Sequence, residues 1–228
     1  MQPYLLPYVG YLHLVRAVDT FVWLDDAQFV KHRWMNRNRI AVDGEVRWLT
    51  LPVRSSPLAT SIRAKRYDLS ERTVATLTET LRHAYGRRPG WESVATLLGG
   101  LGGLGSDSVA EVNAGLVLRS MALLGVEPPR IEWASELGVA ADTPEARVIA
   151  LCRAVGGTEY VNLPGGRELY SARRFADAGL ALSFLEPRLT PYPQGRAAFV
   201  PGLSIVDVLA NDAATAVSAD SFSVESGQ

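Results

Sequence analysis

Short apolar runs alternate with helical segments through the last hundred residues of this chain, and that alternation is the strongest constraint on its fold. We expect strands at 130–133, 160–162 and 180–185, and helices at 143–155 and 168–178. Strands that alternate with helices through compact connections are typical of a parallel sheet covered by helices. The sequence therefore predicts an α/β protein with a mostly parallel, Rossmann-like sheet flanked by helices.

The amino-terminal stretch predicts a loop, a helix and a buried strand. Prolines at positions 3 and 7 fix their own backbone and disfavour helix in the residues before them, so residues 1–8 should be extended or turned. From Gly10 apolar residues recur at helical spacing, and residues 20–24 are rich in β-branched and aromatic side chains. This order places the end of a strand close to residue 25.

A dense group of polar side chains follows that strand. Asp25 and Asp26 stand at its carboxyl end, where open α/β sheets bind ligands, and adjacent strand residues face opposite sides, so we expect one of the two to reach a pocket. The run KHRWMNRNR then contains Lys31, one of two lysines beside twenty-one arginines. Amides and guanidinium groups suit phosphate, carboxylate or sugar hydroxyls. A solvated polar turn is an equally good interpretation.

The middle of the chain predicts a hairpin and then a group of helices. Asp43-Gly44 separates two alternating runs, which indicates a β-hairpin over 40–53. We also expect an edge strand at 62–67, and helices follow over 70–86, 91–98 and 106–124. The glycine-rich run 99–105 lacks the lysine and hydroxyl of a phosphate-binding P-loop and follows no predicted strand, so we interpret it as a flexible connection between helices.

These patterns divide the chain into four parts. We expect an amino-terminal α/β part with a hairpin (1–69), a helical insert or cap (70–127), a carboxy-terminal α/β part of the same sheet (128–217) and a flexible tail (218–228). The segment 204–210 should form a helix that either contributes to catalysis or hydrogen-bonds the amino-terminal loop.

Composition restricts the classes of partner. A net charge of −1 gives no general attraction to nucleic acid or membrane, and no apolar run reaches the ~20 residues of a transmembrane helix. The single cysteine, Cys152, excludes an intrachain disulfide and favours a reducing compartment, so we expect a cytoplasmic protein. The three histidines have no metal-ligand spacing, so no zinc site is predicted. The residues identify neither a cofactor nor an oligomeric state.

A family resemblance adds to this interpretation. The run QPYLLPYVGYLHLVRAVDTFVWLDDAQFVK, with WMNRNRI and WLTLPV after it, resembles the amino-terminal signature of the WbqC-like protein family, and EYVNLPGGRELYS and LSIVDVLAND extend the likeness more loosely. The resemblance implies a bacterial cytoplasmic enzyme of glycoconjugate or natural-product assembly. Two departures stand out: relatives usually begin with an apolar strand before Gln-Pro-Tyr, where this chain has Met1, and carry a Trp-Arg pair where it has residues 67–69.

Two segments supply the candidate site residues, and we expect them to converge on one cavity. The catalytic candidates are Asp25, Asp26, Lys31 and His32. The turn at 162–166 closes a strand and opens a helix, where free N–H groups attract anions, and the resemblance favours a ligand role there over a plain tight turn. The ligand-binding candidates are Gln2, Tyr4, Tyr8, Gly10, Tyr11, Asn36, Arg37, Asn38, Asn162, Gly165, Gly166 and Tyr170.

Three functions fit these residues. The first is a small-molecule transferase, in which Lys31, Arg37 and the Gly165 amide hold an anionic donor and Asp25 or Asp26 acts as a base or metal ligand. The second is nucleotidyl transfer, because the loop before the first helix resembles the paired-histidine loop of nucleotidylyltransferases, with Tyr8 and Tyr11 in place of the histidines. The third is a non-catalytic binding protein within a biosynthetic assembly.

Overall fold

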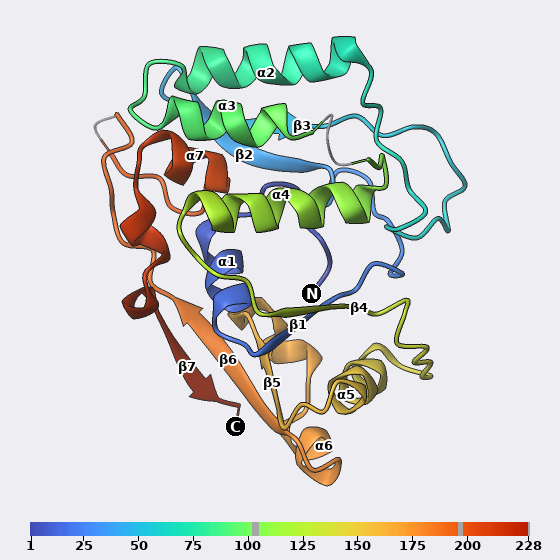
Figure 1. The fold of residues 1–228 in the computed structure, drawn as a ribbon. Coiled ribbons are helices and arrows are strands. Elements are labelled where there is room, and N and C mark those ends of the chain that lie inside the picture. The colour runs from blue at the N-terminus through green and yellow to red at the C-terminus, as the bar shows by residue number, and fades with distance from the viewer. Residues whose placement is uncertain (102–104, 196–197, 228) are drawn as a thin grey trace.

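The computed structural model describes residues 1–101, 105–195 and 198–227. Its strands form three small sheets (Figure 1). In the first, β1 pairs in parallel with β4; in the second, β2 and β3 form an antiparallel hairpin; in the third, β6 pairs in parallel with β5 and antiparallel with β7. The strands are β1 (Thr20–Trp23), β2 (Arg37–Val42), β3 (Glu45–Thr50), β4 (Arg130–Trp133), β5 (Glu159–Asn162), β6 (Ala181–Pro187) and β7 (Phe222–Ser226).

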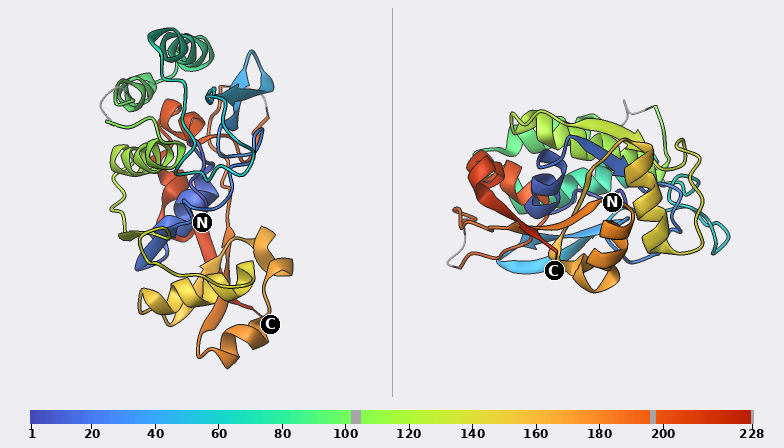
Figure 2. Two further views of the ribbon diagram at one scale, coloured as in Figure 1. Left: turned by 90° about the vertical axis from the view of Figure 1, so that its right-hand side faces the viewer. Right: turned by 90° about the horizontal axis from the view of Figure 1, so that it is seen from below.

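Helices surround these sheets. In Figure 2, left, α2, α3 and α4 stack on one side of the molecule and the β2–β3 hairpin lies on the other. None of the helices in the described ranges is long and apolar enough to cross a membrane. They are α1 (Val9–Arg16), α2 (Glu71–Tyr85), α3 (Trp91–Gly99), α4 (Val109–Leu123), α5 (Pro144–Ala154), α6 (Ala172–Asp177) and α7 (Ile205–Ala210), with 3-10 turns η1 (Pro164–Leu169), η2 (Ala214–Val217) and η3 (Ala219–Ser221).

The structure confirms a mixed α/β fold and most of the expected elements. Asp43 and Gly44 both have positive φ, 51° and 82°, which is the backbone of a tight hairpin turn whose twist suits the flanking strands. The parallel pairs β1–β4 and β5–β6 also agree with the expected strand–helix alternation. A single Rossmann-like sheet is not seen, because β1 and β5 belong to separate sheets.

Three local expectations differ from the structure. The helix expected at 168–178 is replaced by η1 and α6, with extended backbone at Tyr170 between them. Residues 62–67 make isolated bridges, because a turn closed by the Lys65 N–H to the Ser61 carbonyl interrupts the strand. The tail expected to be flexible contains β7, which pairs with the free edge of β6. Residues 102–104 of the expected glycine-rich connection lie outside the described residues.

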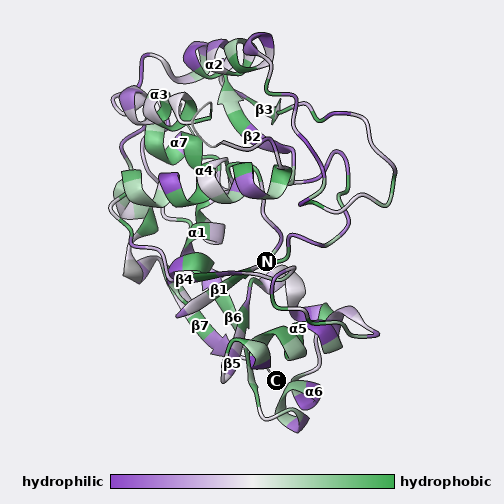
Figure 3. Cartoon of the chain, turned by 45° about the vertical axis from the view of Figure 1, so that its right-hand side comes forward, coloured by the Kyte–Doolittle hydropathy of each residue, from purple (hydrophilic) through white to green (hydrophobic). Residues whose placement is uncertain are grey.

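The core is built around α1 and α7. All six residues of α7 are buried, and hydrophobic residues dominate both helices in Figure 3. The Ser204 hydroxyl donates to the Leu6 carbonyl at 2.8 Å, and the Ile205 N–H donates to the Pro7 carbonyl at 2.8 Å. The start of α7 is therefore hydrogen-bonded to the amino-terminal loop. A second, smaller apolar cluster lies between α5, α6 and β6 and contains Cys152, whose thiol pKa is raised by burial.

Candidate functional site

Hydrogen bonds from the Asn38 side chain hold the backbone of the amino-terminal loop. The Asn38 amide, 2% exposed, donates to the carbonyls of Leu5 and Leu6, both at 2.9 Å, and its Oδ1 accepts the Arg39 N–H. Leu6 has a φ of 42°, in the left-handed region that non-glycine residues rarely adopt. These bonds support the strained backbone, so Asn38 anchors the loop and its amide hydrogens are already used.

Tyr8 and Tyr11, at the start of α1, have different environments. Tyr11 is fully buried, stacks on Trp23 and donates its hydroxyl to the Gln2 carbonyl at 2.7 Å, so it is a core residue. Tyr8 is half-buried, and its ring lies over Gly10, where a Cβ would come within 2.4 Å of the Tyr8 Cε2. The glycine is required there by the tyrosine ring. Tyr4, also half-buried, packs beside Tyr11 with ring centroids 5.6 Å apart.

Glu186, near the end of β6, influences the amino-terminal loop and bonds the residue after the diglycine turn. Burial, followed by the charge of Glu186, raises the pKa of the Tyr8 hydroxyl. Glu186 also accepts a hydrogen bond from Arg167 at 2.8 Å, and Arg167 directly follows Gly165 and Gly166. The charge of Glu186 thus acts on Tyr8, and the same carboxylate is hydrogen-bonded by Arg167; convergence of the two segments on one cavity stays a prediction.

The turn after β5 is shaped by Asn162. This side chain is buried, its Oδ1 accepts the Leu163 N–H at 2.8 Å, and its amide nitrogen would lie 2.3 Å from a Cβ at Gly166. Tyr170 packs its ring against Tyr160 and Phe175. Asn162 thus lies inside the turn, whereas Tyr170 is part of the smaller apolar cluster.

The two carboxylates at the end of β1 have different partners. Asp25, fully buried, accepts the Ser135 N–H at 3.0 Å, the Ser135 hydroxyl at 2.7 Å and Arg63 at 3.3 Å. Asp26 Oδ2 binds Arg147 of α5, while Asp26 Oδ1 is buried without a hydrogen-bond partner among the described residues. Of the pair, only Asp26 therefore has a carboxylate oxygen to which no described residue donates a hydrogen bond.

A small cavity of about 170 Å³ adjoins Asp25. Arg63, Trp133 and two further carboxylates, Glu111 and Glu136, complete its lining. Arg63 binds both Asp25 and Glu136, so its charge is already shared. Within the described ranges, no group of three or more His, Cys, Asp or Glu residues is arranged to hold a metal ion.

The polar run after β1 forms a turn around Asn36. The Asn36 Oδ1 accepts the N–H of His32, which has a φ of 60°, and its amide donates to the Leu51 carbonyl. Asn36 is therefore a structural residue of this turn. Lys31 and His32 are exposed. Arg37 lies 4.0 Å over the ring of Trp48, so its guanidinium is stacked on an aromatic surface.

Lys65 is the residue that the sequence interpretation missed. It is 7% exposed, its Nζ donates to the Ser56 hydroxyl at 2.7 Å and lies 5.3 Å from the Phe29 ring, and no carboxylate in the described ranges forms an ion pair with it. Burial, and secondly the charge of Lys31, lowers the pKa of the Lys65 ammonium. The charge of one of the chain's two lysines therefore acts on the other. Their rarity in an arginine-rich chain was the available signal.

Comparison with known proteins identifies the family. A model of the WbqC-like protein family matches residues 2–219. The chain is also 28% identical over 220 residues to "Uncharacterized protein Rv1507c" of Mycobacterium tuberculosis (strain ATCC 25618 / H37Rv), a match that covers 95% of this chain and 94% of that protein. No solved structure matches. Since the family match spans the amino-terminal loop, the polar turn, Lys65 and the diglycine turn, the chain belongs to the WbqC-like protein family.

Proposed function

We propose that this protein is a transferase that acts on a small molecule in bacterial glycoconjugate or natural-product assembly, and that its donor substrate is anionic. The observation that carries the proposal is the Lys31–Lys65 pair. The Lys65 side chain is 7% exposed and has the Ser56 hydroxyl as its polar partner, and the charge of Lys31 opposes the charge of its ammonium.

Such an arrangement is unfavourable in the free protein and favourable when an anion binds. Burying a charge without a counter-ion costs free energy, and titratable groups perturbed by burial and by a like charge cluster at functional sites. A phosphate or carboxylate placed between Lys31 and Lys65 would neutralise both charges, and the Ser56 hydroxyl would supply a further hydrogen bond. The exposed Lys31 side chain is free to close over the anion.

The segments that carry Lys65 and Asp26 run side by side. The Arg63 N–H donates to the Asp25 carbonyl at 2.7 Å, and the Ile62 N–H donates to the Ala27 carbonyl at 2.9 Å. This pairing supports a role for the unpartnered oxygen of Asp26 as the base that activates the acceptor substrate. The fully hydrogen-bonded carboxylate of Asp25 would hold the neighbouring backbone in place.

Thermal shift with a panel of nucleotides, nucleotide sugars, amino acids and coenzyme A thioesters, with and without magnesium, tests the proposal. An anionic donor at about 100 times its Kd stabilises by about 2.7 kcal/mol, which raises the Tm by roughly 5–10 °C for a chain of this size. Lys65→Met should abolish that shift and leave the Tm of the free protein unchanged or higher, because it removes a repelled, buried charge.

The matched control is Arg72→Met, which removes an exposed cation from the outer side of α2 and should leave the ligand response intact. A response to nucleoside triphosphate with magnesium alone would favour nucleotidyl transfer. Silence across the panel would favour the non-catalytic binding protein. A Lys65→Met variant that keeps the full shift would reject the lysine pair as the donor site.

A further inference from the structure

Cations without ion-pair partners gather in the polar turn after β1 and on the β2–β3 hairpin. The sequence contains no carboxylate at positions 27–42. Elsewhere exposed arginines pair with carboxylates, as Arg54 does with Asp107. Within the described ranges, no such ion pair is formed by Lys31, Arg33, Arg37, Arg39 or Arg47. This part of the surface therefore has an excess of positive charge.

Two tryptophans stack with two of these arginines on the outer face of the hairpin. Arg39 lies opposite Trp48 in the β2–β3 register, and opposite residues of an antiparallel pair point to the same face. The Arg37 guanidinium lies 4.0 Å from the centre of the Trp48 ring, and the rings of Trp34 and Trp48 are 5.4 Å apart. The Arg39 guanidinium lies 5.9 Å from the Trp34 ring. We call these four residues the Trp–Arg face.

The Trp–Arg face is open to solvent although it contains large aromatic side chains. Trp34 is 37% exposed and Trp48 is 48% exposed, whereas Trp23 in the core is fully buried. Neighbouring exposed apolar side chains mark interaction sites, whereas single ones are common on any surface. Arg37 Nε is buried without a hydrogen-bond partner among the described residues. The face therefore combines uncovered rings with a guanidinium that the protein itself leaves poorly satisfied.

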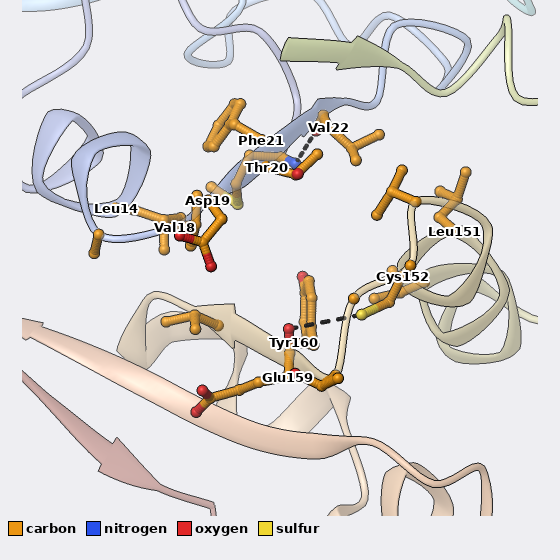
Figure 4. Close-up of a pocket in the computed structure, with 18 of the residues that line it drawn as sticks. Leu14, Val18, Asp19, Thr20, Phe21, Val22, Leu151, Cys152, Glu159 and Tyr160 are labelled. Carbon is orange, nitrogen blue, oxygen red and sulfur yellow. Dashed lines mark hydrogen bonds between the residues drawn. The ribbon is translucent and has the colours of Figure 1, made fainter. Parts of the chain in front are cut away.

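The apolar cavity between the sheets does not suit an anionic ligand. This cavity, about 280 Å³ in volume, lies between α1 and β1 on one side and α5 and β5 on the other (Figure 4). Its charged side chains are those of Asp19 and Glu159, and no lysine or arginine is among its lining residues. These carboxylates repel an anion, so charge directs an anionic ligand to the unpaired cations of the hairpin instead.

The chemistry of the Trp–Arg face fits a nucleobase better than a sugar. Bases stack on aromatic rings and on guanidinium planes, and Arg37 already stands over the Trp48 ring. A sugar ring presents hydrogen atoms with partial positive charge, which a guanidinium repels, whereas a base presents a π face, which attracts a cation. The unpaired arginines and Lys31 suit phosphate oxygens. Base and phosphate together describe a nucleotide.

We propose that the anionic donor is a nucleotide whose base stacks on the Trp–Arg face and whose phosphates reach Lys31. The inference rests on the proposed function, which places the anion between Lys31 and Lys65. Lys31 and Trp34 are three residues apart, so their Cα atoms are separated by at most ~11 Å. One nucleoside diphosphate can contact both. The exposed Arg33, between them in the chain, supplies a further phosphate contact.

Isothermal titration calorimetry with ligands that differ only in the base tests the proposal. ADP, GDP, CDP and UDP are compared with inorganic pyrophosphate, which carries the charge without the base. We expect at least one nucleoside diphosphate to bind about tenfold or more tightly than pyrophosphate, the effect of one stacked base. Trp48→Ala should remove that preference, and Trp48→Phe, which keeps an aromatic ring, should retain most of it.

Val46→Ala is the matched control, because Val46 is an exposed apolar residue of the same strand and should not affect the preference. Equal binding of pyrophosphate and all four nucleoside diphosphates would overturn the nucleotide assignment. So would a preference that survives Trp48→Ala with an intact fold by circular dichroism, or the failure of all four nucleoside diphosphates to bind.

Lys65→Met separates this inference from the proposed function. It should weaken pyrophosphate and the nucleoside diphosphates by the same factor and leave their ratio unchanged. Weaker pyrophosphate binding in Lys65→Met, with no base preference in the wild type, would overturn the nucleotide and leave the lysine pair standing. Unchanged pyrophosphate binding in Lys65→Met, with a base preference lost in Trp48→Ala, would reject the lysine pair and support the Trp–Arg face.

Discussion

Replacing Asn38 with alanine should destabilise the protein severely although Asn38 touches no expected ligand. Its amide group makes two 2.9 Å hydrogen bonds to the Leu5 and Leu6 carbonyls in a buried position. Each carbonyl left unsatisfied costs about 1–3 kcal/mol. The left-handed backbone at Leu6 would lose its main support as well. We therefore expect a loss of about 2–5 kcal/mol in the free energy of unfolding.

Urea-induced unfolding followed by circular dichroism measures this loss, and a thermal scan should show a Tm lower by roughly 5–15 °C. Asn38→Asp sharpens the test, because a carboxylate still accepts the Arg39 N–H but cannot donate to the two carbonyls and repels them. It should be at least as destabilising as Asn38→Ala. Arg47→Ala, at an exposed position on the neighbouring strand, is the control and should change stability by less than about 0.5 kcal/mol. An Asn38→Ala variant as stable as this control would refute the anchoring role.

Two further predictions concern α1. Gly10→Ala should destabilise the protein because its Cβ would meet the Tyr8 ring. In a Tyr8→Ala background the same change should be neutral or stabilising, since alanine favours helix over glycine by ~1 kcal/mol. Additive losses of stability in a double-mutant cycle would contradict the close approach of Tyr8 to Gly10. Burial lowers the pKa of His13, whose Nε2 lies 2.8 Å from the Ala216 carbonyl, below the ordinary 6.5. The unfolded chain therefore binds more protons near that pH, so stability should be full above pH ~6.5 and fall as the pH is lowered. The slope of unfolding free energy against pH should flatten in His13→Gln, while the buried Met1 amino group continues to contribute between pH 8 and 5. An unchanged slope would count against a neutral, buried His13.

Local chemistry was enough to place most elements in the sequence. The Asp43-Gly44 pair predicts the hairpin because both turn residues need positive φ, and apolar spacing at 3.6 residues locates the helices. The helix expected at 143–155 is α5, Pro144–Ala154, which Thr143 caps by accepting the Ala146 N–H. The carboxylates at the end of β1 were also evident, because they directly follow an apolar run.

The tertiary structure alone decided which groups the polar side chains bond. The sequence treated Asn36 and Asn38 as ligand-binding amides, whereas both are occupied by backbone groups that come from distant loops. It could not separate Asp25, which is hydrogen-bonded to Ser135, from Asp26, because Ser135 lies 110 positions away in the chain. Side-chain roles of this kind depend on long-range contacts that no local pattern encodes.

What the sequence by itself determined is therefore the order of helices and strands and the position of the polar turn after β1. The tertiary structure alone decided that Lys65 is buried against Ser56, that β7 extends the β6 edge, and that a cavity lies between β1 and β5. The physical reason is range: backbone propensity and periodicity act over a few residues, whereas charge pairing and strand pairing depend on segments that meet only when the core packs.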